Sequence, residues 1–87
     1  MEQRENAGYV IVEALHIGKA EFVIGENPTA PAPYVTWECK DGSNYFWGHY
    51  LMTRESAEAD LLKRAGTELR RQQQNRKQEN KDKERER

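Results

Sequence analysis

One stretch of sequence decides the fold of this chain: Tyr34-Val35-Thr36-Trp37-Glu38-Cys39-Lys40, then Asp41-Gly42-Ser43-Asn44, then Tyr45-Phe46-Trp47-Gly48-His49-Tyr50-Leu51. It holds six of the chain's eight aromatic residues. Two runs rich in aromatic and β-branched residues, one on each side of an Asp-Gly turn signal, predict a β-hairpin. In the first run Val35, Trp37 and Cys39 alternate with polar residues, which is the pattern of a strand with one buried face.

The length of the turn decides which aromatic residues of the second strand face the core, because a one-residue slip flips every side chain. A loop of two residues and a loop of four give the same parity, and both place Phe46, Gly48 and Tyr50 on the core face. The outer face then carries Tyr45, Trp47, His49 and Leu51, beside Thr36 and Glu38. A loop of three residues inverts the strand, burying Trp47 and exposing Phe46 and Tyr50. With each of these lengths, aromatic residues remain on the second face.

A second hairpin is predicted upstream. Residues 9–16 are rich in β-branched and aromatic types, and residues 20–24 form a second apolar run. Gly18-Lys19 supply the central turn residues, so Leu15 is expected to pair with Phe22 and Glu13 with Ile24. Residues 25–33 contain three prolines, which indicates a connecting loop.

A helix is predicted after the aromatic hairpin, with Thr53 as its N-cap. Its apolar stripe consists of Ala57, Leu61, Leu62, Ala65 and Leu69. Of these, Leu61, Leu62 and Leu69 are expected to hold the helix to the sheet. No apolar residue follows Leu69, so the helix either continues as a polar extension or frays.

These elements predict an α+β fold, a four-stranded antiparallel meander with one C-terminal helix packed on one face. Residues 1–8 are expected to be a flexible N-terminus, residues 9–69 a single domain, and residues 70–87 a charged polar tail. One helix covers only one face of a sheet. The apolar residues on the other face therefore predict a second cover, such as another copy of the chain or a different partner.

Composition excludes several classes of protein. One cysteine among 87 residues excludes an internal disulfide framework and a Cys-rich zinc site. No apolar run approaches the roughly 20 residues that span a bilayer, and the polar first residues are unlike a signal peptide. We therefore expect a soluble, cytoplasmic protein with no membrane partner.

The formal net charge of −1 conceals an asymmetry. Residues 1–69 hold six Lys/Arg against eleven Asp/Glu, whereas residues 70–87 hold eight against four. A basic tail raises the alternative of nucleic-acid binding, and the candidate contacts are Arg70, Arg71, Arg76 and Lys77. The aromatic hairpin opposes this alternative, because it carries only Lys40 against Glu38 and Asp41.

Catalytic and metal-binding patterns are weak. Cys39, His16 and His49 are the residues with nucleophilic, basic or soft-ligand character near neutral pH. The favoured strand parity places Cys39 and His49 on opposite faces, and the histidines lack the short spacing of metal motifs. The sequence thus predicts no enzyme, no cofactor and no metal site. The candidate partner-binding residues are instead Tyr34, Tyr45, Trp47 and His49, on the outer face of the aromatic hairpin.

Three segments carry a family resemblance: Glu21-Phe22-Val23-Ile24-Gly25, Pro33-Tyr34-Val35-Thr36-Trp37 and Tyr45-Phe46-Trp47-Gly48-His49-Tyr50. In these segments the chain resembles small uncharacterised proteins of conjugative elements in Gram-positive gut bacteria. The resemblance covers about residues 9–65 and brings no catalytic motif. It implies an accessory role in element transfer, in regulation or in evasion of host defence, through inhibition by binding. The expected function is that of a small non-enzymatic binding module whose partner is a protein or a second copy of itself.

Overall fold

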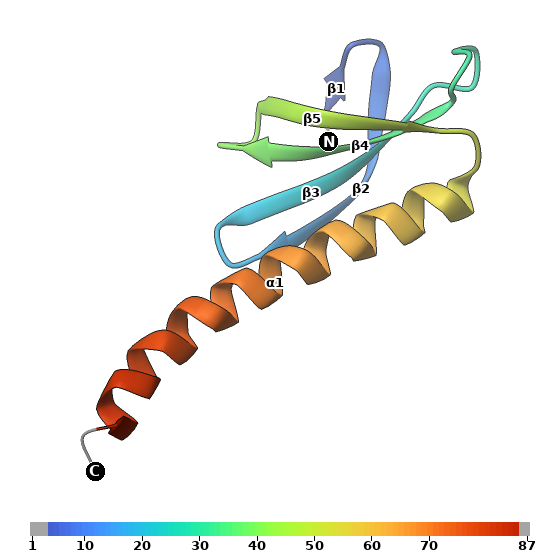
Figure 1. The fold of residues 1–87 in the computed structure, drawn as a ribbon. Coiled ribbons are helices and arrows are strands. Elements are labelled where there is room, and N and C mark those ends of the chain that lie inside the picture. Colours follow the sequence, from blue (N-terminus) through green and yellow to red (C-terminus); the bar gives the residue numbers. More distant parts are fainter. Residues whose placement is uncertain (1–3, 86–87) are drawn as a thin grey trace.

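The computed structural model describes the backbone of residues 4–85 and the side chains of residues 4–74. In this part of the chain, five strands form one antiparallel meander and a long helix follows (Figure 1). The elements are β1 (Glu5–Asn6), β2 (Tyr9–Ile17), β3 (Ala20–Glu26), β4 (Tyr34–Lys40), β5 (Asn44–Leu51) and α1 (Arg54–Arg85). The predicted α+β class, the antiparallel meander and the C-terminal helix are confirmed. No described helix combines the length and the apolar character that crossing a bilayer requires.

The sheet has five strands rather than the four predicted, because β1 precedes the first predicted strand. Asn6 pairs with Tyr9 across a two-residue turn in which Ala7 and Gly8 both have positive φ (54° and 85°). Positive φ at both central residues is what such a tight hairpin turn requires. Glu5 and Asn6 are two polar residues without alternation, so no pattern in the sequence indicates this strand.

The hairpin of β2 and β3 has the predicted register. Gly18 has a φ of 60°, and Ile17 pairs with Ala20 across the turn. Leu15 pairs with Phe22 and Glu13 with Ile24, as expected.

One face of the sheet packs on α1, which begins as predicted. The Thr53 hydroxyl oxygen accepts a hydrogen bond from the backbone N–H of Ser56 at 3.1 Å, which is N-cap geometry. The helix then buries Ala57, Leu61 and Ala65, and these form one core with residues of the sheet. The buried sheet residues of this helix-side core are Phe22 and Ile24, and the partly buried ones are Val12, Leu15, Ile17, Ala20, Tyr34 and Leu51.

The prediction that Leu62 and Leu69 hold the helix to the sheet is wrong, since their exposures are 64% and 40%. A helical residue advances by about 100°, so a step of four residues turns the side chain by only about 40°. Ala57, Leu61 and Ala65 therefore stay on one face, whereas Leu62 points well away from Leu61. By Leu69 the drift has carried the stripe away from the sheet.

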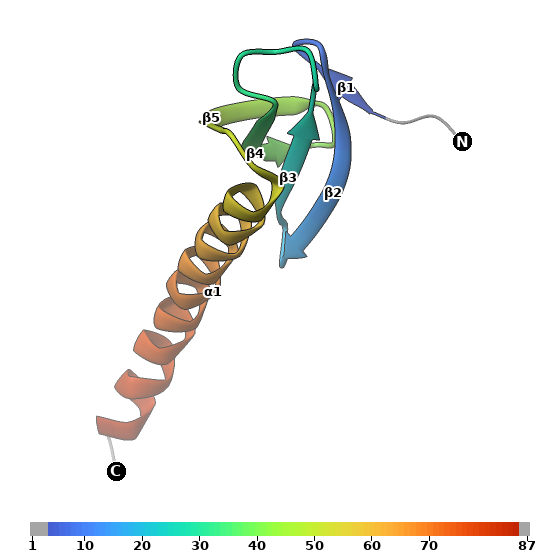
Figure 2. The same ribbon diagram turned by 90° about the vertical axis from the view of Figure 1, so that its right-hand side faces the viewer.

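The other face of the sheet is covered by the chain itself, because the sheet curls (Figure 2). The buried residues of this inner core are Tyr9, Ile11, Val23, Val35, Trp37 and Cys39. The loop between β3 and β4 closes over them: Ala30 packs against the core, and the Tyr9 hydroxyl donates to the carbonyl of Ala32 at 2.7 Å. A second chain is thus not needed to cover this face, which removes the reason for which the sequence predicts one.

An ion pair fastens the N-terminal strand over the inner core. Arg4 Nη2 lies 2.7 Å from Glu21 Oε2, and the Arg4 guanidinium stacks over the Tyr45 ring at 5.9 Å. Arg4 also donates to the carbonyl of Gly42 in the turn between β4 and β5, at 3.3 Å. The hydrogen bond from Arg4 outweighs burial and lowers the pKa of Glu21, which is 7% exposed.

Candidate functional site

The turn between β4 and β5 has three residues, which neither favoured loop length allowed. Lys40 pairs with Asn44, and Asp41 and Gly42 both have positive φ (59° and 75°). The start of β5 is therefore inverted relative to the favoured prediction. Tyr45 lies opposite Cys39 and packs on the inner core, whereas Phe46 lies opposite Glu38.

A β-bulge at Trp47 and Gly48 then returns the side chains that follow it to the faces that the favoured prediction gave them. The register passes from Phe46 opposite Glu38 to His49 opposite Thr36, so that Trp47 and Gly48 together face Trp37. The predicted parity returns beyond the bulge, but Tyr50 is 58% exposed rather than buried. The other outcome considered for a three-residue loop, a buried Trp47, is also wrong, since Trp47 is 70% exposed.

Trp47 occupies the strained position of the bulge, with a φ of 57°. In bulges with one left-handed residue, glycine usually takes that position. Here the glycine is needed one residue later, because a Cβ on Gly48 would lie 2.8 Å from Trp37 Nε1 and 3.1 Å from Trp37 Cδ1. Only glycine fits at position 48, because the backbone there packs closely on the inner core. The left-handed conformation therefore falls on Trp47.

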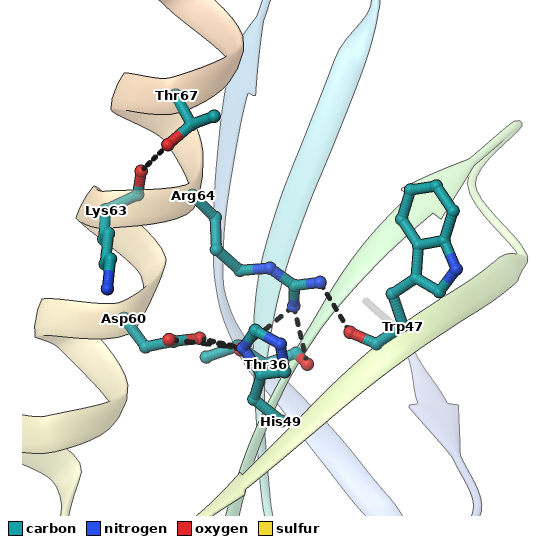
Figure 3. Close-up of polar contacts among 7 residues, drawn as sticks. All are labelled: Thr36, Trp47, His49, Asp60, Lys63, Arg64 and Thr67. Carbon is teal, nitrogen blue, oxygen red and sulfur yellow. Dashed lines mark hydrogen bonds and ion pairs between the residues drawn. The ribbon is translucent and has the colours of Figure 1, made fainter.

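Arg64 of α1 fixes the backbone of this bulge (Figure 3). Its Nη2 donates to the carbonyl of Trp47, and its Nη1 donates to the carbonyl and the hydroxyl of Thr36, at 3.0 and 3.1 Å. All three acceptors are uncharged. Burial lowers the pKa of Arg64, against the opposing attraction of Asp60 and Glu38.

Asp60 lies one helical turn before Arg64 and organises the rest of the network. It accepts a hydrogen bond from the Thr36 hydroxyl, and His49 Nδ1 lies 3.0 Å from its Oδ2. A carboxylate only accepts hydrogen bonds, so Nδ1 carries the proton. Burial acts to raise the pKa of Asp60, but the hydrogen bonds from Thr36 and His49 outweigh it and lower that pKa.

These side chains surround a groove of about 370 Å³ between β5 and α1. Its lining residues are Phe22, Glu38, Trp47, His49, Asp60, Lys63, Arg64, Thr67, Glu68 and Arg71. Phe22, 3% exposed, supplies an apolar floor, and Trp47 stands at the rim. We call this feature the β5–α1 groove.

The structure brings together two of the four predicted contact residues. Trp47 and His49 both line the β5–α1 groove. Tyr34 packs against the helix-side core, and its hydroxyl donates to Glu26 at 3.4 Å. Tyr45 packs against the inner core, with its ring centroid 5.5 Å from that of Trp37.

The predicted nucleic-acid residues all lie on α1. Arg70 and Arg71 are exposed, and Arg71 lines the groove while forming an ion pair with Glu68. The side chains of Arg76 and Lys77 lie outside the described residues.

Thr36, Asp60 and Arg64 were missed by sequence reasoning. The available signal was the spacing of Asp60 and Arg64, four residues apart and one residue before the buried Leu61 and Ala65. Polar groups at the margin of a buried stripe often reach across to the neighbouring sheet. Their partners depend on the register of β5, which the sequence did not determine.

The chemical capacity of the groove is limited. Asp60 orients His49, yet the described hydrogen bonds place no nucleophilic side chain at His49 Nε2. Cys39 is buried in the inner core, and burial raises the pKa of its thiol, which disfavours the reactive thiolate. Among the described residues, no three His, Cys, Asp or Glu side chains are arranged to hold a metal ion.

The fold and the groove define the class of this protein: a small α+β domain whose curled antiparallel sheet carries one helix and a groove with an exposed tryptophan at its rim. Comparison with known proteins found no match to a family model, to a curated protein or to a solved structure.

Proposed function

We propose that this chain is a small non-enzymatic protein-binding module and that Trp47, at the rim of the β5–α1 groove, is its principal contact residue. One observation carries the proposal. Trp47 is 70% exposed, holds a left-handed backbone conformation and is fixed there by Arg64.

This arrangement works against stability on its own. A left-handed conformation costs about 1–2 kcal/mol for a residue with a Cβ, and an exposed indole gives up the burial that a core position would provide. Strained residues held by their surroundings occur preferentially at binding sites and active sites. Tryptophan is also among the residues most enriched at the energetic centres of protein interfaces.

His49 is the second proposed contact residue, because it lines the same groove and Asp60 holds its ring. Tyr34 and Tyr45, which pack against the two cores, support the hairpin rather than the contact. The partner is a protein, either a different one or a second copy of this chain. Sedimentation distinguishes these two partners: a wild-type dimer that becomes a monomer in a Trp47 variant indicates a second copy of the chain.

For the biological setting we propose the one that the sequence resemblance implies. A cytoplasmic mobile-element accessory or counter-defence inhibitor acts by occupying the surface of another protein, and a small domain with one prominent contact residue suits that role. In this proposal the biological role comes from the sequence resemblance, and the β5–α1 groove is the partner-binding surface.

The decisive experiment compares three immobilised chains as baits against native host extract, with captured proteins identified by mass spectrometry. The baits are wild type, Trp47→Gly and Leu62→Ala, the last removing an exposed apolar side chain that does not line the groove. We expect a partner that wild type and Leu62→Ala retain and Trp47→Gly loses, while all three remain folded. Equal retention by Trp47→Gly refutes the proposal.

Nucleic-acid binding by the basic tail is the alternative function. It is favoured by the exposed Arg70 and Arg71, which directly precede the residue of α1 that contacts the β2–β3 turn. The helix continues beyond that turn (Figure 1). A chain truncated after Gln74 and carrying Arg70→Glu keeps the hydrogen bond from Gln72 to the carbonyl of Ile17. If the alternative holds, this chain loses a salt-sensitive gel shift that the full chain shows. Absence of a shift with the full chain rejects it.

A further inference from the structure

Some charged residues of the β5–α1 groove form no ion pair with another described residue of the chain. Asp60 accepts from Thr36 and His49, and Glu68 accepts from Arg71 and Gln72. By contrast, neither Lys63 nor Arg64 forms an ion pair with a carboxylate among the described residues.

Arg64 is placed to receive an anion. Its hydrogen bonds go to three neutral oxygens, and its charge is partly removed from water without a directly bonded counter-charge. Glu38 is the lining carboxylate without a described hydrogen bond, and after Asp60 it offsets part of the charge of Arg64. The positive side of the groove continues along α1 through the exposed Arg70 and Arg71.

The apolar part of the groove lies beside these cations. Phe22 forms the floor and the Trp47 indole rises at the rim. An occupant that fits both parts has an apolar side chain for the indole and a carboxylate within reach of Lys63 and Arg64.

We infer that the β5–α1 groove binds an acidic protein segment, in which an Asp or Glu lies next to one apolar side chain. The inference rests on the proposed function and names the chemistry of its partner. A nucleic acid fits less well, because its backbone carries a charge at every unit and would meet Glu38, Asp60 and Glu68 in turn. A segment that brings one carboxylate to Lys63 and Arg64 places fewer negative charges near these acids.

The test is selection of peptides from a random phage-displayed library on the immobilised full chain. Selected peptides are then synthesised, and their affinities are measured by protection of Trp47 fluorescence from acrylamide. Trp37 is 4% exposed and contributes little to that quenching. The variant is Lys63→Glu, since Lys63 is exposed and its side chain makes no described hydrogen bond. The matched control, Lys19→Glu, makes the same charge change at an exposed turn residue outside the groove.

We expect the selected peptides to share an acidic residue beside an apolar one. We expect Lys63→Glu to weaken them by about fivefold to tenfold and Lys19→Glu to leave them unchanged. Peptides that need Trp47 but lack an acid, or that bind Lys63→Glu equally well, overturn the inference and leave the proposed function standing. Peptides that bind Trp47→Gly as tightly as wild type, measured by isothermal titration calorimetry because this variant lacks the reporting indole, refute both. A single-stranded oligonucleotide that displaces the peptides, and loses this ability with Lys63→Glu, overturns the inference in favour of nucleic acid.

Discussion

The guanidinium of Arg64 donates a hydrogen bond to the carbonyl of Trp47, so the helix fixes the one residue of β5 that has a left-handed backbone. This contact joins the two walls of the β5–α1 groove. It also explains how an exposed tryptophan keeps a conformation that side chains with a Cβ rarely adopt.

Replacing Trp47 with glycine should relieve the strain that alanine retains. The indole is mostly exposed, so both variants lose little packing apart from the contact with Phe46, whose ring centroid lies 5.0 Å away. We expect Trp47→Gly to be more stable than Trp47→Ala by about 1 kcal/mol, measured by urea unfolding, because glycine adopts positive φ without a steric penalty. A Trp47→Gly chain clearly less stable than Trp47→Ala would show that the bulge stores no strain at this residue.

Removing the Arg64 guanidinium should loosen the bulge. Arg64→Met keeps much of the aliphatic volume but leaves the carbonyls of Thr36 and Trp47 without this donor. We expect a loss of about 1–3 kcal/mol in the free energy of unfolding and greater local mobility of Trp47, seen as a fall in its fluorescence anisotropy. Arg64→Lys should recover part of the loss, since one ammonium cannot reproduce the two-pronged contact. Unchanged anisotropy in Arg64→Met would contradict the fixing role.

Much of the fold could be predicted from the sequence because local patterns and tertiary packing agree there. Gly18 marks the turn between β2 and β3, Thr53 marks the helix start, and alternation in residues 35–39 marks β4. The course of β5 could not be predicted, since Asp41-Gly42 suits turns of several lengths. The bulge was not predicted either, because Gly48 makes room for Trp37 and the positive φ falls on Trp47.

The unknown register of β5 also limited the prediction of the candidate site. Trp47 and His49 were predicted as contact residues because aromatic residues on the outer face of a hairpin suggest a contact surface. Arg64 and Asp60 were missed because their role depends on which strand residues lie opposite the helix. A register known only to within one residue cannot place Thr36 or the Trp47 carbonyl beside them.

Two glycine substitutions test the packing explanation of the bulge. Gly48→Ala should destabilise the chain by about 1–3 kcal/mol, because the new methyl group would contact the buried Trp37 ring. Gly66→Ala is the matched control: a Cβ there meets nothing within 4 Å, and it should stabilise α1 by about 1 kcal/mol. Thermal unfolding monitored by circular dichroism measures both changes. A neutral Gly48→Ala would mean that this glycine has no packing role.

The Arg4–Glu21 ion pair should make stability depend on pH in the acid range. The pKa of Glu21 is lowered in the folded chain, so its contribution is present above the unfolded pKa and is lost as pH falls through the folded pKa. Glu21→Gln should therefore be less stable than wild type near pH 7, and the difference should shrink as pH falls below about 4. Urea unfolding of both chains between pH 7 and pH 2.5 measures it. A difference that stays constant over this range would exclude the ionised carboxylate as its source.

Leu61 and Leu62 are adjacent in sequence, and only one of them should matter for stability. Leu61 is 2% exposed between α1 and the sheet, whereas Leu62 is 64% exposed. Leu61→Ala should cost about 2–5 kcal/mol, because it removes buried methyl groups and leaves a cavity in the helix-side core. Leu62→Ala should change the free energy of unfolding by no more than about 0.5 kcal/mol. Urea unfolding of the two variants makes the comparison within one helical turn. Equal losses would mean that Leu62 is buried in solution, and a loss for Leu62→Ala that grows with protein concentration would assign that burial to a second copy of the chain.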